Sequence, residues 1–177
     1  MSWSTRLAKR GAIGATALFL FALAIGCAGA RLNTTPSIPI GLYWRTTASV
    51  ERGAYVMFCP PAGASFSQVK DRGYVGPGFC PGGYGYLMKR VLAAGTDRIS
   101  VRLDGVRVNG ALLPLSAPLL ADKAGRPLAH FQAFNRTLGA QEVLPMSDVN
   151  PLSYDGRYFG PITRSQIEAV IVPVLTW

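Results

Sequence analysis

Lys89 has clear potential for chemistry because it is a basic side chain inside an apolar run. The run from Tyr86 to Leu92 reads Tyr-Leu-Met-Lys-Arg-Val-Leu and is apolar enough to form a buried strand. Burial disfavours the charged ammonium and lowers a lysine pKa, which makes the neutral amine available as a general base. Lowering that pKa from about 10.4 to about 7.5 corresponds to roughly 4 kcal/mol, a cost that a functional site can carry. The alternative is a lysine at a strand end whose ammonium reaches water.

Ser37 is the candidate nucleophile for such a base. It lies between Pro36 and Pro39 in the run Thr-Thr-Pro-Ser-Ile-Pro-Ile-Gly. Pro36 favours an extended backbone at Thr35, while Ser37 keeps its own N–H, which would be available to an oxyanion. An ordinary proline-rich stalk is the alternative. The 52 positions between Ser37 and Lys89 leave their meeting in space entirely to the fold.

A third polar cluster, residues 147–160, reads Ser-Asp-Val-Asn-Pro-Leu-Ser-Tyr-Asp-Gly-Arg-Tyr-Phe-Gly. Its side chains suit a buried hydrogen-bond network beside a site, and a surface turn is the alternative. The single histidine, His130, lies in no recognisable motif, so a Ser-His-Asp or Cys-His mechanism is not expected. The sequence carries no metal-ligand spacing and no dinucleotide or P-loop fingerprint, and we expect neither a metal nor a cofactor.

The N-terminal segment indicates export or membrane anchoring. An uncharged stretch of twenty residues, Gly11 to Ala30, follows three basic residues: Arg6, Lys9 and Arg10. As a helix it would span about 30 Å and match a bilayer core. The positive-inside rule keeps the basic end in the cytoplasm and places the chain after Arg31 on the far side of the membrane.

We therefore predict an anchor at residues 1–30 and an extracytoplasmic domain at residues 31–177. A retained anchor is the preferred fate, with cleavage after Ala30 or lipid attachment at Cys27 as alternatives. The net charge of +9 suits an anionic partner. The basic residues are scattered singly through apolar sequence, which favours a membrane surface and argues against a nucleic acid.

Short apolar runs separated by Gly and Pro predict a mainly β domain after Arg31. Ser100 to Val108 predicts a hairpin with Asp104-Gly105 as its turn, and a strand is expected near Ala169 to Val174. One short helix is expected, roughly Ser65 to Arg72. Residues 117–137 lack clear periodicity and predict an excursion off the sheet, either a surface loop or a place for substrate contacts.

Cys59 and Cys80 occur in similar Phe-Cys-Pro settings and look like partners. In an exported domain, a bridge between them would close a loop of about twenty residues and contribute roughly 3 kcal/mol. Two buried free thiols are the alternative.

The three clusters, in this order, resemble the conserved boxes of the type I signal peptidases. Ser37-Ile38-Pro39 matches the serine box, Lys89-Arg90-Val91 the lysine box, and residues 153–160 the C-terminal box. Residues 33–44, residues 79–86 and the closing Trp177 are most similar to the TraF-type peptidases of plasmid conjugative transfer. The resemblance covers most of the chain beyond residue 31.

The resemblance implies a signal-peptidase-like β fold preceded by one N-terminal transmembrane or signal helix. It implies a dyad in which Ser37 is the nucleophile and Lys89 the general base. It also implies an oxyanion hole formed by the Ser37 N–H and the Thr35 hydroxyl. The Ser153 hydroxyl would orient Lys89, and Asp155 and Arg157 would form a supporting ion pair.

The same resemblance implies a pilin precursor as substrate, a periplasmic domain tethered to the inner membrane, and other conjugation or type IV secretion components as partners. Cyclisation of the product follows by analogy only. Ile38 stands where housekeeping enzymes usually have methionine, and Ser147 where they have glycine. Both departures point away from a general leader peptidase, which is one alternative. The other is a non-catalytic envelope component, against which the intact Ser37 and Lys89 argue.

Overall fold

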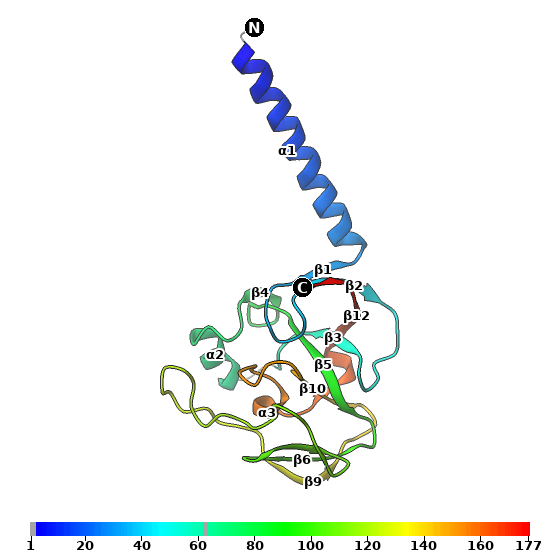
Figure 1. The fold of residues 1–177 in the computed structure, drawn as a ribbon, viewed down its shortest axis with the longest axis vertical. Coiled ribbons are helices and arrows are strands. Elements are labelled where there is room, and N and C mark those ends of the chain that lie inside the picture. Colours follow the sequence, from blue (N-terminus) through cyan, green and yellow to red (C-terminus); the bar gives the residue numbers. More distant parts are fainter. Residues whose placement is uncertain (1–2, 62–63) are drawn as a thin grey trace.

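The computed structural model describes residues 3–61 and 64–177 and shows a long helix projecting from one end of a β-rich body (Figure 1). The helix, α1 (Trp3–Ala28), contains a stretch from Lys9 to Ala28 that is long and apolar enough to cross a membrane. None of that stretch is buried against the rest of the protein. The body follows after Gly29 alone, so the first strand begins directly at the foot of α1.

The larger sheet contains seven antiparallel strands among the described residues, in the order β1-β2-β12-β3-β5-β10-β11. The strands are β1 (Ala30–Asn33), β2 (Gly41–Thr46), β3 (Tyr55–Phe58), β5 (Leu87–Ala94), β10 (Glu142–Met146), β11 (Ile162–Thr163) and β12 (Ile167–Thr176). The long strand β12 extends the strand predicted near Ala169 to Val174 at both ends.

A smaller sheet lies at the end of the body away from α1 (Figure 1). Its order is β8 (Ala111–Leu112), β7 (Gly105–Val108), β6 (Arg98–Arg102) and β9 (Ala133–Thr137). The predicted hairpin is present, with its turn one residue earlier than the sequence predicts. Because Arg102 pairs with Gly105, Leu103 and Asp104 connect the strands. Gly105 has a φ of 132° and packs close to Ser116, so the glycine serves the strand instead of the turn.

Two further expectations need correction. The helix predicted at Ser65 to Arg72 is present as α2 (Ala64–Asp71), but α3 (Gly156–Phe159) is an additional short helix inside the third polar cluster. The last residues of the predicted excursion pair with β6 as β9, so the loop proper ends near Gln132. A short strand, β4 (Pro77–Cys80), and a 3₁₀ turn (Arg164–Gln166) complete the described elements.

Three apolar clusters form the core. One packs the large sheet against α2 and α3, a second joins β5 and β10 to the small sheet, and a third, which contains Ile38, lies beneath the segment between β1 and β2. A disulfide between Cys59 and Cys80 ties the end of β3 to β4. The prediction of a mainly β protein with one N-terminal apolar helix is confirmed.

Candidate active site

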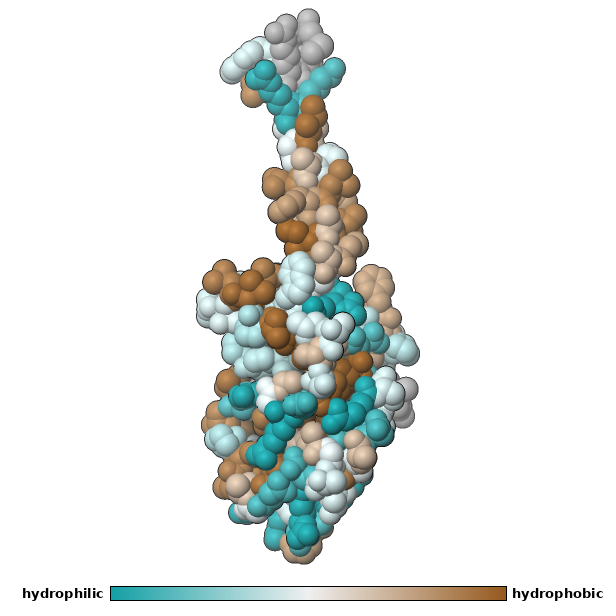
Figure 2. Space-filling view, turned by 90° about the vertical axis from the view of Figure 1, so that its right-hand side faces the viewer, coloured by the Kyte–Doolittle hydropathy of each residue, from teal (hydrophilic) through white to brown (hydrophobic). Residues whose placement is uncertain are grey.

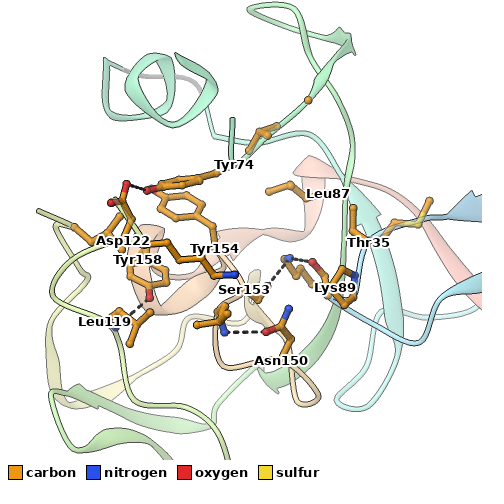
Figure 3. Close-up of a pocket in the computed structure, with 18 of the residues that line it drawn as sticks. Thr35, Tyr74, Leu87, Lys89, Leu119, Asp122, Asn150, Ser153, Tyr154 and Tyr158 are labelled. Carbon is orange, nitrogen blue, oxygen red and sulfur yellow. Dashed lines mark hydrogen bonds between the residues drawn. The ribbon is translucent and has the colours of Figure 1, made fainter. Parts of the chain in front are cut away.

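Strand β5 places Lys89 on its buried face. Burial alternates strictly along the strand, so Leu87, Lys89 and Val91 point inward. The Lys89 side chain is only 2% exposed. Its amine nitrogen lies 2.6 Å from Ser37 Oγ and 2.7 Å from Ser153 Oγ (Figure 3). The fold thus brings together three side chains from distant parts of the chain.

Burial is the main reason why the Lys89 amine is prepared for proton transfer. The pKa of Lys89 is lowered from 10.5 to about 8, mainly by desolvation; the negative charge of Asp155 opposes this shift and the positive charge of Arg157 adds to it. At pH 7 about one Lys89 side chain in ten is then neutral, compared with about one in three thousand at the ordinary pKa. A neutral amine can accept the Ser37 proton while it donates to Ser153.

The segment that carries Ser37 is held from both sides. Ile38 is fully buried in the third apolar cluster and fixes the chain immediately after Ser37. Asn33, which is 3% exposed, lies on the other side. Its amide nitrogen is 2.8–3.0 Å from the carbonyl oxygens of Thr35, Ile38 and Pro39. The turn that presents Ser37 is therefore organised around one buried amide.

Thr35 and Ser37 differ in how free their donors are. The Thr35 hydroxyl and backbone N–H both donate to Asn33 Oδ1, at 3.0 and 3.2 Å. The backbone N–H of Ser37 donates to no protein group among the described residues. Thr35 lines the same cleft as Ser37, but its proton is already used. As an oxyanion donor, the Ser37 N–H is the better prepared of the two.

Arg157 and Asp155 form a fully buried ion pair at the centre of the hydrogen-bond network of the third polar cluster. Both side chains are 0% exposed, and their charged atoms are 2.8 Å apart. Arg157 also donates to four backbone carbonyl oxygens, of Leu115, Asn150, Pro151 and Ser153. Asp155 in turn accepts from the backbone N–H groups of Ser147 and Arg157. Because Arg157 holds the Ser153 carbonyl, this network orients the Ser153 hydroxyl toward Lys89.

Ser37 and Lys89 face a cleft of about 530 Å³. Lys89, which is hydrogen-bonded to Ser37, lies at one end of the cleft (Figure 3). Three tyrosines line the part beyond Ser153: Tyr74, Tyr154 and Tyr158 (Figure 3). The opposite wall comes from residues 119–128. A cleft of this size is within the range that binds a peptide or small ligand.

Two parts of this site were missed at the level of sequence. Asn33 gives no signal of its own, since an asparagine after an apolar helix is equally typical of a turn. The wall at residues 119–128 comes from a region for which the sequence favours a surface loop over a substrate contact. The predicted residues Ser37, Lys89, Ser153, Asp155 and Arg157 do lie in one continuous network, with Thr35 at its edge.

Comparison with known proteins places the chain in a family. Residues 6–177 match the family described as signal peptidase, peptidase S26. The chain belongs to the signal peptidase family S26. This confirms the family that the three boxes predicted.

Several family members named for plasmid transfer are similar over nearly the whole chain. Two from Escherichia coli, both named plasmid transfer protein TraF, are 62% identical over 97% of each chain and 60% identical over 100% of each chain. A probable conjugal transfer protein TraF from Sinorhizobium fredii is 37% identical, covering 84% of this chain and 78% of its own. A crystal structure of signal peptidase I from Enterococcus faecalis is 19% identical, with a TM-score of 0.42, and covers 72% of this chain and 100% of its own.

Proposed function

We propose that this signal peptidase family member is a serine endopeptidase that uses Ser37 as nucleophile and Lys89 as general base. The contact that carries the proposal is the 2.6 Å separation of Lys89 Nζ and Ser37 Oγ, made by a lysine that is 2% exposed. A surface lysine beside a serine would stay protonated at neutral pH. Burial on β5 reduces that obstacle, because it raises the fraction of neutral Lys89 at neutral pH.

The chemistry follows from these positions. The neutral Lys89 amine takes the proton of Ser37 Oγ as that oxygen attacks the scissile carbonyl carbon. The Ser37 N–H stabilises the oxyanion. The Lys89 ammonium then gives its proton to the departing amine, the C–N bond breaks, and an ester with Ser37 remains.

Two fates of the ester are chemically balanced. Water can attack it, with Lys89 taking the water proton and returning one to Ser37 Oγ, which leaves a free carboxylate. An amino group at the other end of the substrate can attack instead, which forms a new amide and a cyclic product. The two products differ in mass by one water.

We propose a pilin precursor as the substrate, processed during plasmid conjugative transfer. The support is the close similarity to proteins named for plasmid or conjugal transfer, combined with membership in a signal peptidase family. Other conjugation or type IV secretion components are the expected partners. Cyclisation of the pilin is the proposed fate of the acyl-enzyme.

We propose a periplasmic peptidase domain, residues 31–177, tethered to the inner membrane by residues 1–30 with the N-terminus in the cytoplasm. The exposed apolar surface of α1 supports this location (Figure 2). Large apolar side chains from β1, β4 and the chain end after β12 are also exposed: Leu32 at 59%, Phe79 at 97% and Trp177 at 72%. The disulfide fits an oxidising compartment.

Processing of the pilin precursor in cells is the direct test, with wild type compared to Ser37→Ala and Lys89→Met. Ser165→Ala and Lys70→Met are matched controls, because neither residue lines the cleft. We expect both dyad variants to leave the precursor uncut at normal protein levels while both controls process it. A wild-type product lighter than the linear cleavage product by one water would show cyclisation. Normal processing by either dyad variant would refute the mechanism.

A further inference from the structure

The wall of the cleft opposite the dyad is a hairpin, residues 119–128, that lies outside the three family boxes. Three hydrogen bonds anchor it to two other segments, the stretch after α2 and the helix α3. The Leu119 N–H donates to the Tyr158 hydroxyl at 3.1 Å, the Tyr74 hydroxyl donates to Asp122, and Arg72 donates to the Pro127 carbonyl at 2.8 Å (Figure 3). These anchors make the hairpin a fixed wall of the cleft.

Asp122 is fully occupied within this hairpin. Oδ1 accepts from the backbone N–H groups of Ala124 and Arg126, and Oδ2 accepts from the Tyr74 hydroxyl and from Arg126 Nε. A carboxylate has about four acceptor sites, so Asp122 has none left for a further partner. Its charge is also balanced by Arg126.

Aromatic packing stiffens the same wall. Tyr154 stacks on Tyr158 with ring centroids 5.0 Å apart and on Tyr74 at 5.7 Å. The Arg126 guanidinium lies over the Tyr74 ring, 6.0 Å from its centroid. Arg126 is thus held by both a carboxylate and a ring, so its cation is not free to meet a ligand.

Lys123, between Asp122 and Ala124 in the same hairpin, differs from these neighbours. It lines the cleft, yet its ammonium has no hydrogen bond or ion pair within the described part of the chain. It also does not contribute to the pKa shift of Lys89, which arises from burial, Asp155 and Arg157. The cleft therefore has one uncompensated cation on the wall opposite the dyad.

We propose that Lys123 binds a carboxylate of the polypeptide substrate. Among the groups of an unmodified polypeptide, carboxylates are the principal anions at neutral pH. Lys123 is exposed to solvent, so such an ion pair is screened by salt and is strongest at low ionic strength. The carboxylate is either an Asp or Glu side chain near the scissile bond or a free C-terminus. This inference rests on the proposed function, because it concerns the substrate of the same site.

Paired substrates test the proposal. The substrates are internally quenched peptides with an Ala-Xaa-Ala cleavage site. In one series, each position around the scissile bond is occupied in turn by Asp or by Asn. In a second series, each peptide ends either in a free C-terminal carboxylate or in an amide. We expect wild type to prefer the charged member of one pair by about two- to fivefold in kcat/KM at low salt, the effect of an exposed ion pair. Lys123→Met should abolish that preference, Lys123→Glu should reverse it, and Lys123→Arg should retain it. A preference within an Asp/Asn pair identifies a side-chain carboxylate as the partner of Lys123, and a preference within the acid/amide pair identifies the C-terminus.

Arg52→Met is the matched control, since it removes one exposed positive charge away from the cleft and should leave the preference unchanged. Binding of the same peptides to Ser37→Ala, followed by fluorescence anisotropy, measures the preference without cleavage. An equal preference in wild type and Lys123→Met, or none in wild type, would overturn the inference. Lys123-dependent binding without any cleavage by wild type would refute the peptidase function alone.

Discussion

Replacing Lys89 by methionine should abolish activity and stabilise the fold at neutral pH. The ammonium is the form that burial penalises, because it is removed from water on folding. The difference between the ordinary lysine pKa of 10.5 and about 8 corresponds to about 3 kcal/mol. Methionine has similar length and carries no charge. It leaves the buried Ser153 hydroxyl without its 2.7 Å partner, which costs about 1 kcal/mol. The expected net gain is about 2 kcal/mol.

The gain should depend on pH in a direction fixed by the pKa shift. Below pH 8 the lysine is protonated in both folded and unfolded states, so the wild type carries the full penalty. Between pH 8 and 10.5 the folded state loses its proton while the unfolded state keeps it, and wild-type stability rises. The advantage of Lys89→Met should therefore shrink to near zero by about pH 10.

Urea unfolding of the full chain in detergent, followed by tryptophan fluorescence at pH 7 and pH 10, measures this. Lys70→Met is the control for loss of a lysine on a partly exposed surface, where we expect a change within about 0.5 kcal/mol. A Lys89→Met protein that is no more stable than wild type at pH 7, or whose advantage is equal at both pH values, would refute the reasoning. Either result would mean that Lys89 is not penalised by burial.

Three further predictions concern the surroundings of the dyad. Asp155→Asn leaves the buried Arg157 unpaired and should lower the free energy of unfolding in urea by about 3–5 kcal/mol. Because Asp155 raises the pKa of Lys89, the variant that remains folded should reach its maximal rate at a lower pH than wild type. Asn33→Ala and Asn33→Asp should both lower kcat, because the three carbonyl oxygens require a hydrogen-bond donor that neither replacement supplies. An Asn33→Asp enzyme with normal kcat would contradict this. Cys59→Ala with Cys80→Ala should lower stability by about 3 kcal/mol, a loss that reductant should reproduce in wild type and not in the variant.

The sequence was sufficient for the features that depend on composition over many residues. Twenty uncharged residues after a basic segment predict a membrane helix because length and apolarity decide that outcome. Short apolar runs between Gly and Pro likewise predict strands. The hairpin turn was misplaced by one residue because Asp-Gly is a strong turn signal, whereas here close packing against Ser116 places Gly105 in the strand.

The residue pattern indicates Lys89, Ser37 and the third polar cluster separately, and only the family boxes join them into one site. Nothing local indicates that Ser37 and Lys89 meet, because their contact depends on β5 lying in the middle of the sheet while the Ser37 segment follows its edge strand β1. The role of Asn33 is equally invisible in the sequence, because the three carbonyl oxygens that it contacts come together only in the folded turn. Lys123 is evident only when its neighbours' partners are known.

Strand register decides which of two adjacent bases reaches the serine. Lys89 and Arg90 are neighbours on β5, but Lys89 faces the interior while Arg90 faces outward and pairs with Asp148 at 2.6 Å. The flanking residues are apolar on both faces, so the sequence pattern does not choose between the two arrangements. A shift of one residue would bring a guanidinium to Ser37, and an arginine does not lose its proton in a protein. The pairing of β5 with β3, which sets Lys89 opposite Val56, is therefore as necessary to the proposed chemistry as the lysine itself.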